Sequence, residues 1–145
     1  MKRVLHGLIF LALCVLVVAA FLTVFDTAQD TTSRPLADKT SMIGGKPTTC
    51  STLFEQPCAY SLQSEYNQWG DRLETFVTSS PLGSYASEIG FVASAKLSLQ
   101  ACSLARTAGR TVLDFESLAR RDHPEAVSSQ LFAFWNRTPQ GLCPR

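Results

Sequence analysis

The chain begins with a nearly continuous apolar run, residues 4–25, that differs from every later segment. Lys2 and Arg3 precede the run, and Asp26 and Asp30 follow it. A helix of about 20 residues spans the hydrocarbon core of a bilayer, so this run is just long enough to cross a membrane. Basic residues gather on the cytoplasmic side of membrane segments. The pattern predicts one transmembrane helix, with a cytoplasmic amino terminus and the rest of the chain outside.

A cleaved secretory signal is the alternative for the same run. Val18-Ala19-Ala20 would supply the small residues of a cleavage site, and Phe21 would then begin the mature protein. The apolar core of a secretory signal is typically about 7–15 residues long, and this run is longer. An uncleaved anchor is therefore favoured. Both interpretations deliver the remaining chain to the same side of the membrane.

Farther along the chain, apolar residues recur at steps of three and four, which is typical of helices with one buried face. The first such helix starts at Ala59 or Tyr60, and a turn over residues 79–83 ends it. Gly70 weakens this helix by about 1 kcal/mol without breaking the pattern. Its apolar stripe consists of Leu62, Tyr66, Trp69, Leu73, Phe76 and Val77.

A longer helix is predicted over residues 85–108, which contain no proline. Ser84 can cap its start, and Gly109 is well placed to end it. One face carries larger apolar residues, and the neighbouring face is rich in small ones, so another helix can approach closely. We expect this to be the central helix, with Cys102 on it. The two faces hold Tyr85, Ile89, Val92 and Leu99, and Ala86, Gly90, Ala93, Leu97, Ala101, Leu104 and Ala108.

Two shorter helices complete the pattern. Thr111 and Asp114 predict the start of one, and Pro124 at the first helical position predicts the start of the other. The sequence Thr138-Pro139-Gln140-Gly141 is expected to break the second. The apolar stripes are Val112, Phe115 and Leu118, and Val127, Leu131, Phe134 and Trp135. The predicted fold is therefore all-α: a bundle of about four helices over residues 50–145, with no strand of useful length.

Residues 26–49 have the composition of a flexible tether between anchor and domain. They are rich in threonine, serine, aspartate, glycine and proline, and apolar residues are sparse. Such a segment buries too little apolar surface to offset the entropy lost on ordering. If it were ordered, we would expect it to lie against a partner.

Four of the five cysteines, Cys50, Cys58, Cys102 and Cys143, follow the apolar run, which itself holds Cys14. An even number of cysteines in a small exported domain indicates disulfide bonds. Three pairings are possible, and we favour Cys50–Cys58 around Pro57 and Cys102–Cys143 between the long helix and the tail. A zinc site is the alternative. It is disfavoured, because the cysteines lack Cys-x-x-Cys spacing and the one downstream histidine stands outside any ligand pattern.

The chain has 145 residues and a net charge of +1, and its charges are mixed in sign. This composition gives no electrostatic footprint for nucleic acid. His123 is the single histidine beyond the apolar run, and we expect it to be exposed beside Pro124. No motif for a nucleophile, a metalloprotease or a cofactor is present, so we predict a protein that is not an enzyme and needs no cofactor.

The remaining polar and aromatic residues have ordinary structural interpretations. The carboxylates Glu65, Asp71, Glu74 and Glu88 fall on polar helix faces, although a glycosidase-type pair among them is a remote alternative. The aromatic residues Trp69, Tyr85, Phe134 and Trp135 are expected in the core rather than on a docking patch. The arginines Arg106, Arg110, Arg120 and Arg121 are expected to be scattered and solvated rather than joined in one basic surface.

Several features of the second half of the chain occur together in one known family. They are Phe91, Ala95, Ala101-Cys102 with Leu104, the break at Gly109, the apolar Val112-Leu113 turn and the end Gly141-Leu142-Cys143-Pro144. With them, residues 73–145 loosely resemble a small family of exported actinobacterial proteins whose domain has no assigned function. The resemblance implies an exported helical domain, by analogy a bond between Cys102 and Cys143, and no particular reaction.

Together these features predict a membrane-anchored extracytoplasmic module. We expect it to contact lipid through residues 4–25 and to bind other proteins, as an accessory subunit of an envelope complex such as a respiratory assembly. A released secreted domain and a small envelope hydrolase are the alternatives.

Overall fold

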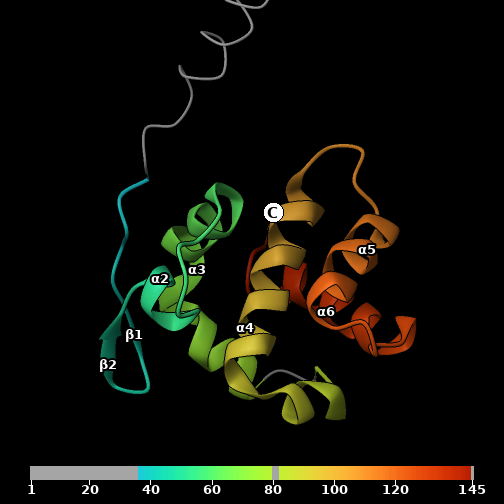
Figure 1. Cartoon of the computed structure of the whole chain (residues 1–145), viewed down its shortest axis with the longest axis horizontal. Helices are drawn as coiled ribbons and strands as arrows, with labels where there is room; N and C mark the ends of the chain where they lie inside the picture. The colour runs from blue at the N-terminus through green and yellow to red at the C-terminus, as the bar shows by residue number, and fades with distance from the viewer. Residues whose placement is uncertain (1–35, 80–81, 145) are drawn as a thin grey trace, which may run out of the picture. The chain divides into compact units, whose positions relative to one another are not determined.

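The computed structural model of the chain describes residues 36–79 and 82–144, and this part is mostly helical, as predicted (Figure 1). The predicted anchor and residues 26–35 of the predicted tether lie outside the described residues. No helix in the described ranges is long and apolar enough to cross a membrane. The described elements are β1 (Ser41–Ile43), β2 (Lys46–Thr48), α2 (Cys50–Leu53), α3 (Tyr60–Ser79), α4 (Ser84–Arg106), α5 (Val112–Asp122) and α6 (Ser128–Gly141).

The predicted first helix is confirmed as α3, and its apolar stripe faces the core. Leu62, Tyr66, Leu73 and Phe76 are buried, while Trp69 and Val77 are partly buried against the same core. The steps of three and four place these side chains on one face of the helix, which packs against α4. The stripe therefore provides one side of the domain core.

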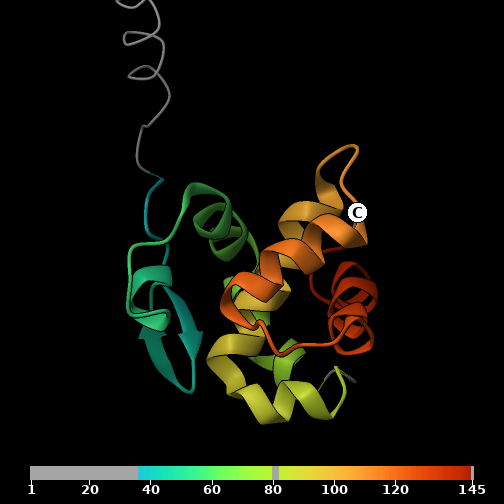
Figure 2. The same ribbon diagram turned by 45° about the vertical axis from the view of Figure 1, so that its right-hand side comes forward.

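The long helix is central, as predicted, but it is not continuous. α4 packs against α3, α5 and α6, and it buries Ala95, Leu97, Leu99 and Ala101. At Gly90 the backbone has φ 78° and ψ 175°, which breaks the helix into two parts, and Figure 2 shows the bend. Glycine adopts this conformation without steric cost, so the break falls there. The prediction of one unbroken helix over residues 85–108 was wrong.

The start of α4 also differs from its prediction. Gly83 occupies the cap position, and Ser84, the predicted cap, is the first residue of the helix. Across the break, Ser94 Oγ donates a hydrogen bond to the carbonyl of Ala86 (2.9 Å), which ties the two parts together. This side-chain bond therefore helps to fix the short first part to the long second part.

The two short helices are present, but the second begins and ends later than predicted. α5 starts with a capping box between Thr111 and Asp114, as expected, and runs on to Asp122. Pro124 lies in a turn, because α6 begins only at Ser128. Pro139 lies inside α6 and does not break it. A proline in the last turn forgoes one backbone hydrogen bond, and this helix tolerates that loss.

The predicted tether is wrong for the part that the structure describes. β1 and β2 form an antiparallel hairpin in which Ser41 lies opposite Thr48. The hydroxyl of Tyr66 donates to the Thr48 carbonyl (2.6 Å), and the amide of Gly44 donates to Glu74 (2.9 Å), so the hairpin packs on α3. Polar contacts hold this segment, which explains why the sparse apolar residues did not reveal it. The surface it lies against belongs to its own chain.

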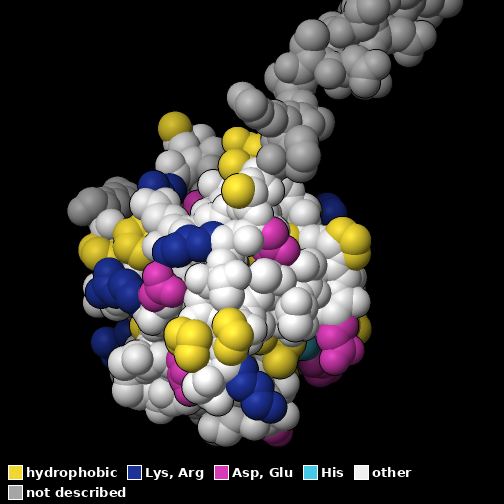
Figure 3. Space-filling view, turned by 90° about the vertical axis from the view of Figure 1, so that its left-hand side faces the viewer, with side chains coloured by type: hydrophobic (Ala, Val, Ile, Leu, Met, Phe, Trp, Pro, Cys, Tyr) yellow, Lys and Arg dark blue, Asp and Glu magenta, His cyan; other side chains and the backbone are white. Residues whose placement is uncertain are grey.

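Asp38 joins the segment before the hairpin to α2 and α3. Its carboxylate accepts hydrogen bonds from the Cys50 amide (3.2 Å), the Ser51 hydroxyl (2.8 Å) and the Gln63 side-chain amide (2.9 Å). The compact unit accordingly begins at Leu36 rather than at Cys50. Figure 3 views the hairpin side of the domain, where basic and acidic side chains are interspersed and hydrophobic side chains form only small patches.

Gly70→Ala is expected to destabilise the protein, although alanine is the better helix former by about 1 kcal/mol. A Cβ at position 70 would collide with the Oγ of Ser41 and come within 3.1 Å of its Cβ. Ser41 is buried in the hairpin, so its hydroxyl would have to turn away and β1 would have to shift slightly. Overpacking of this kind costs about 1–3 kcal/mol, and we expect a net loss of about 1 kcal/mol in urea unfolding.

The matched control is Gly70→Ala combined with Ser41→Gly, which makes room for the new methyl group. Adding Gly70→Ala to the Ser41→Gly variant should therefore cost no stability, so the double variant should be at least as stable as Ser41→Gly alone. A single variant that is more stable than the wild type would show that helix propensity outweighs the contact with the hairpin.

Asp38→Asn is expected to lower stability by about 1 kcal/mol at pH 7 and by less at pH 3. Burial is the largest single influence and raises the pKa of Asp38, but the hydrogen bonds from Ser51, Gln63 and Cys50 together outweigh it, so the pKa is lowered. A lowered pKa means that the stabilisation is complete above the ordinary value of 3.8 and is lost as the pH falls through the folded value. Asp38 is exposed, and solvent screening keeps its contribution to the free energy of unfolding small.

Urea unfolding of the wild type and of Asp38→Asn at pH 7, 5 and 3 tests this expectation. The difference between the two proteins should be similar at pH 7 and 5 and should shrink at pH 3. A difference that stays constant down to pH 3 would mean that the ionised form of Asp38 contributes nothing specific.

Candidate functional site

The four cysteines singled out in the sequence form two disulfide bonds with the favoured pairing. Cys50 is bonded to Cys58, and Cys102 is bonded to Cys143. Cys102 and Cys143 are fully buried, whereas Cys58 is only partly buried at the edge of the core. None of the four is a free thiolate, so the zinc alternative for these cysteines is excluded. Beyond them, no cluster of three or more metal-ligating side chains occurs in the described ranges.

A groove of about 400 Å³ lies where α4 passes between the start of α3 and α5. The disulfide loop and the first turn of α3 contribute Gln56, Pro57, Ala59, Ser61 and Leu62 to its lining. α4 contributes Lys96, Gln100, Ser103 and Leu104, and Thr107 follows directly after it. Arg110 and Leu118 line the remaining part. Clefts of about 300–1,000 Å³ with mixed apolar and polar linings are the usual form of binding sites.

The groove combines one sign of charge with neutral hydrogen-bonding groups. Its lining holds two basic side chains, Lys96 and Arg110, and no carboxylate. The acidic partners of these bases belong to α5 and stand outside the lining: Lys96 pairs with Asp122 at 2.9 Å, and Arg110 pairs with Asp114 at 3.2 Å. Each base keeps further N–H donors, because a lysine has three and an arginine five.

Gln100 is the unusual member of this lining. Its Oε1 atom is shielded from solvent and has no hydrogen-bond partner among the described residues. A buried acceptor without a partner costs about 1–3 kcal/mol, so folded proteins rarely leave one. The terminal torsion of a glutamine side chain is soft, and the amide can turn at little cost. The periodic pattern of apolar residues in the sequence did not indicate this groove. Gln100 is polar, and it lies next to the apolar face of the central helix.

The Cys50–Cys58 bond holds the groove in shape. Its loop supplies Gln56 and Pro57 to the lining, and Ala59 follows it directly. Within the loop, Glu55 adopts φ 55°, a conformation that is uncommon for residues other than glycine. The bond therefore fixes a loop that local backbone preference alone would not hold.

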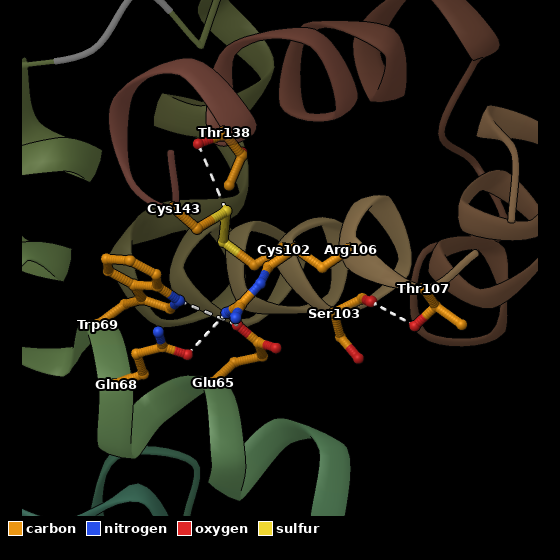
Figure 4. A network of polar contacts seen from close by, with 9 residues as sticks. All are labelled: Glu65, Gln68, Trp69, Cys102, Ser103, Arg106, Thr107, Thr138 and Cys143. Atoms are coloured by element: carbon orange, nitrogen blue, oxygen red, sulfur yellow. Dashed lines mark hydrogen bonds and ion pairs between the residues drawn. A yellow bond between two sulfur atoms is a disulfide. The ribbon is translucent and has the colours of Figure 1, made fainter. Parts of the chain in front are cut away.

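A second polar cluster joins α3 to the end of α4 beside the buried Cys102–Cys143 bond (Figure 4). Arg106 Nη1 donates to Gln68 Oε1 (2.6 Å) and contacts Glu65 Oε2 (3.3 Å), which also accepts from Trp69 Nε1 (3.0 Å). The Arg106 guanidinium lies 5.7 Å from the centroid of the Trp69 ring, and Arg72 lies 5.9 Å from it. All these groups have partners, so the cluster is a structural junction.

The carboxylates singled out in the sequence have separate structural surroundings. Glu65 is buried in the junction, so its assignment to a polar face was wrong. Asp71 pairs with Lys39 at 2.8 Å, and Glu74 accepts the Gly44 amide. Glu88 is exposed on α4. Asp71 and Glu74 therefore hold the hairpin segment in place.

His123 is less exposed than predicted. Its side chain is only 16 % exposed, and its ring meets the Tyr85 ring edge-on at 6.3 Å. His123 Nδ1 lies 3.5 Å from Glu125 Oε1, which also accepts the Tyr85 hydroxyl (2.9 Å). Burial, followed by this hydrogen bond to Glu125, raises the pKa of Tyr85 to about 12. The hydroxyl is thus held protonated and fixes the loop before α6 to the start of α4.

The aromatic and basic residues singled out in the sequence are placed as follows. Tyr85 and Phe134 are core residues, as predicted, whereas Trp69 and Trp135 are only partly buried against the core. The arginines do not join into one basic surface: Arg106 pairs with Glu65, Arg110 with Asp114, and Arg120 with Glu116, while Arg121 is exposed.

Comparisons with models of known protein families, with curated proteins and with solved structures found no match to this chain. The resemblance of residues 73–145 to exported actinobacterial proteins therefore stays a prediction from the residues that carry it.

Proposed function

We propose that this chain is a membrane-anchored, extracytoplasmic interaction module. In this proposal it binds another protein without catalysing a reaction, as an accessory subunit of a larger envelope complex. The observation that carries the proposal is the groove beside α4, which is open and is lined in part by Gln100, whose solvent-shielded Oε1 has no hydrogen-bond partner among the described residues. If the Gln100 amide turns toward the groove, a ligand bound there can complete its hydrogen bonds.

The disulfide bonds support the proposed location. Disulfides persist in oxidising compartments and are rare in the cytosol. Both bonds here belong to the structural frame, one across the buried core and one beside the groove. The apolar run at residues 4–25 supplies the expected route across the membrane and, if uncleaved, the anchor.

Amino-terminal sequencing of the protein isolated from its natural source tests the anchor. A mature chain that begins at Met1 supports the anchored module. A chain that begins near Phe21 would instead support the secreted domain, and reduced thiols at the four paired cysteines would contradict both.

Co-purification tests the interaction function. The full chain is extracted from membranes in mild detergent and analysed by size-exclusion chromatography with mass spectrometry. We expect it to elute with other membrane proteins in a complex larger than its own mass. Elution as a lone monomer under conditions that preserve known envelope complexes would count against the proposal.

A further inference from the structure

We infer that the groove beside α4 binds an extended peptide segment in which an acidic side chain stands next to an apolar one. This inference rests on the proposed interaction function and specifies the chemistry of the partner segment. Three properties of the groove support it: the unpartnered Oε1 of Gln100, a lining that holds basic residues but no carboxylate, and the apolar side chains in the same lining.

The Gln100 amide selects for a segment with free backbone hydrogen-bonding groups. In the unbound protein the solvent-shielded Oε1 has no partner among the described residues. In this inference the soft last torsion of the side chain lets the amide turn toward a bound ligand. An extended peptide offers both N–H and C=O groups along its length, so it can pair with the amide in either orientation. The interior of a helix offers neither, because its backbone groups are already bonded to each other.

The charge of the lining selects for an acidic side chain. Lys96 and Arg110 belong to the lining of the groove, and the carboxylates that pair with them, Asp122 and Asp114, lie outside it. The ammonium and the guanidinium each have an acidic partner on α5 but keep further donors, so a ligand carboxylate can share them. A basic peptide would meet two like charges in the same space.

The apolar part of the lining accommodates the neighbouring side chain. Leu104 and Leu118 are partly buried here, and Pro57 and Leu62 line the groove from the side of α3. Side chains in an extended segment alternate in direction, so adjacent residues can direct a carboxylate to the bases and an apolar group to the leucines. A volume of about 400 Å³ suits a few residues and is small for a folded domain.

The probe for this inference is a displayed library of random heptapeptides. It is selected on the oxidised full chain in phosphatidylcholine nanodiscs, with empty nanodiscs as the background. We expect enriched peptides in which aspartate or glutamate stands next to leucine, isoleucine, valine or phenylalanine. Absence of enrichment, or enrichment of basic peptides, would overturn the inference.

Gln100→Met separates a binding role from a structural one. Methionine has a similar length and leaves no unpartnered acceptor, so the melting temperature should stay the same or rise, while the affinity for the best enriched peptide should fall at least tenfold. Arg110→Gln should also weaken binding, because it removes a charge from the lining. Arg121→Gln is the matched control: it removes an exposed arginine outside the lining and should leave binding unchanged.

Two results with these variants would show that the inference is wrong. One is equal affinity for the wild type and Gln100→Met. The other is a lower melting temperature for Gln100→Met, which would assign the side chain a packing role. Co-purification distinguishes this failure from failure of the proposed function. If partner proteins co-purify with Gln100→Met at wild-type levels, the proposed function stands and only the peptide-binding role of the groove is rejected. If no other protein co-purifies with the wild-type chain, the proposed function itself is contradicted.

Discussion

Replacing Cys102 by serine is expected to lower the free energy of unfolding by about 4 kcal/mol. The Cys102–Cys143 bond joins residues 41 positions apart, and closing a loop of that length stabilises a protein by about 4 kcal/mol in the chain-entropy model. Cys102 and Cys143 are both fully buried, so the remaining thiol and the new hydroxyl gain no solvation. A total stability of about 5–15 kcal/mol leaves little margin for such a loss.

Cys143→Ser should have nearly the same effect, because either substitution removes the same bond. The double variant Cys102→Ser/Cys143→Ser should be about as unstable as each single variant in urea unfolding. The variant Cys50→Ser/Cys58→Ser provides a comparison. The bond that it removes joins residues with a sequence separation of 8, so its loss should cost about 2.5 kcal/mol. Additive losses at Cys102 and Cys143 would mean that the two residues are not bonded in the native protein.

Arg106→Ala is expected to lower the free energy of unfolding by about 2–3 kcal/mol, the second largest effect. The Glu65 side chain is 11 % exposed and would lose its only cationic partner among the described residues, and Gln68 would lose its donor. Removing one partner of a buried ion pair typically costs about 3–5 kcal/mol. Arg106 is itself 37 % exposed, so water can reach the site and the expected loss is smaller.

Glu65→Gln provides the control for this prediction. A neutral amide still accepts the Trp69 indole hydrogen and no longer needs a cation. Urea unfolding of the two single variants and the double variant Glu65→Gln/Arg106→Ala forms a double-mutant cycle. The double variant should be more stable than Arg106→Ala alone. Strict additivity would show that Arg106 acts through its stacking on Trp69 and not through the charge of Glu65.

The helices were predictable where apolar periodicity and end signals agree. The stripe from Leu62 to Phe76 predicted α3, and the pair Thr111 and Asp114 predicted the start of α5. The predictions from single prolines are wrong. Pro124 predicts a helix start and Pro139 a helix end, yet α6 begins at Ser128 and continues past Pro139 to Gly141.

The groove could not have been predicted from the sequence. Gln100, Lys96 and Arg110 are ordinary polar residues on or near helices, and a groove exists only once α4 lies between α3 and α5. The same holds for the junction, because Glu65 and Arg106 are 41 positions apart in the chain. The sequence shows the chemistry of each side chain, but which side chains lie next to each other depends on how the helices pack.

The sequence by itself determined the helical class of the domain and its approximate helices, because these follow from local periodicity. It limited the four cysteines to three pairings, and the favoured one is the pairing that the structure shows. Only the tertiary structure decided that residues 36–49 belong to the domain, that α4 bends at Gly90, and that Gly70 lies close against Ser41. Each of those depends on which surfaces meet, because Ser41 and α3 come into contact only after the chain has folded.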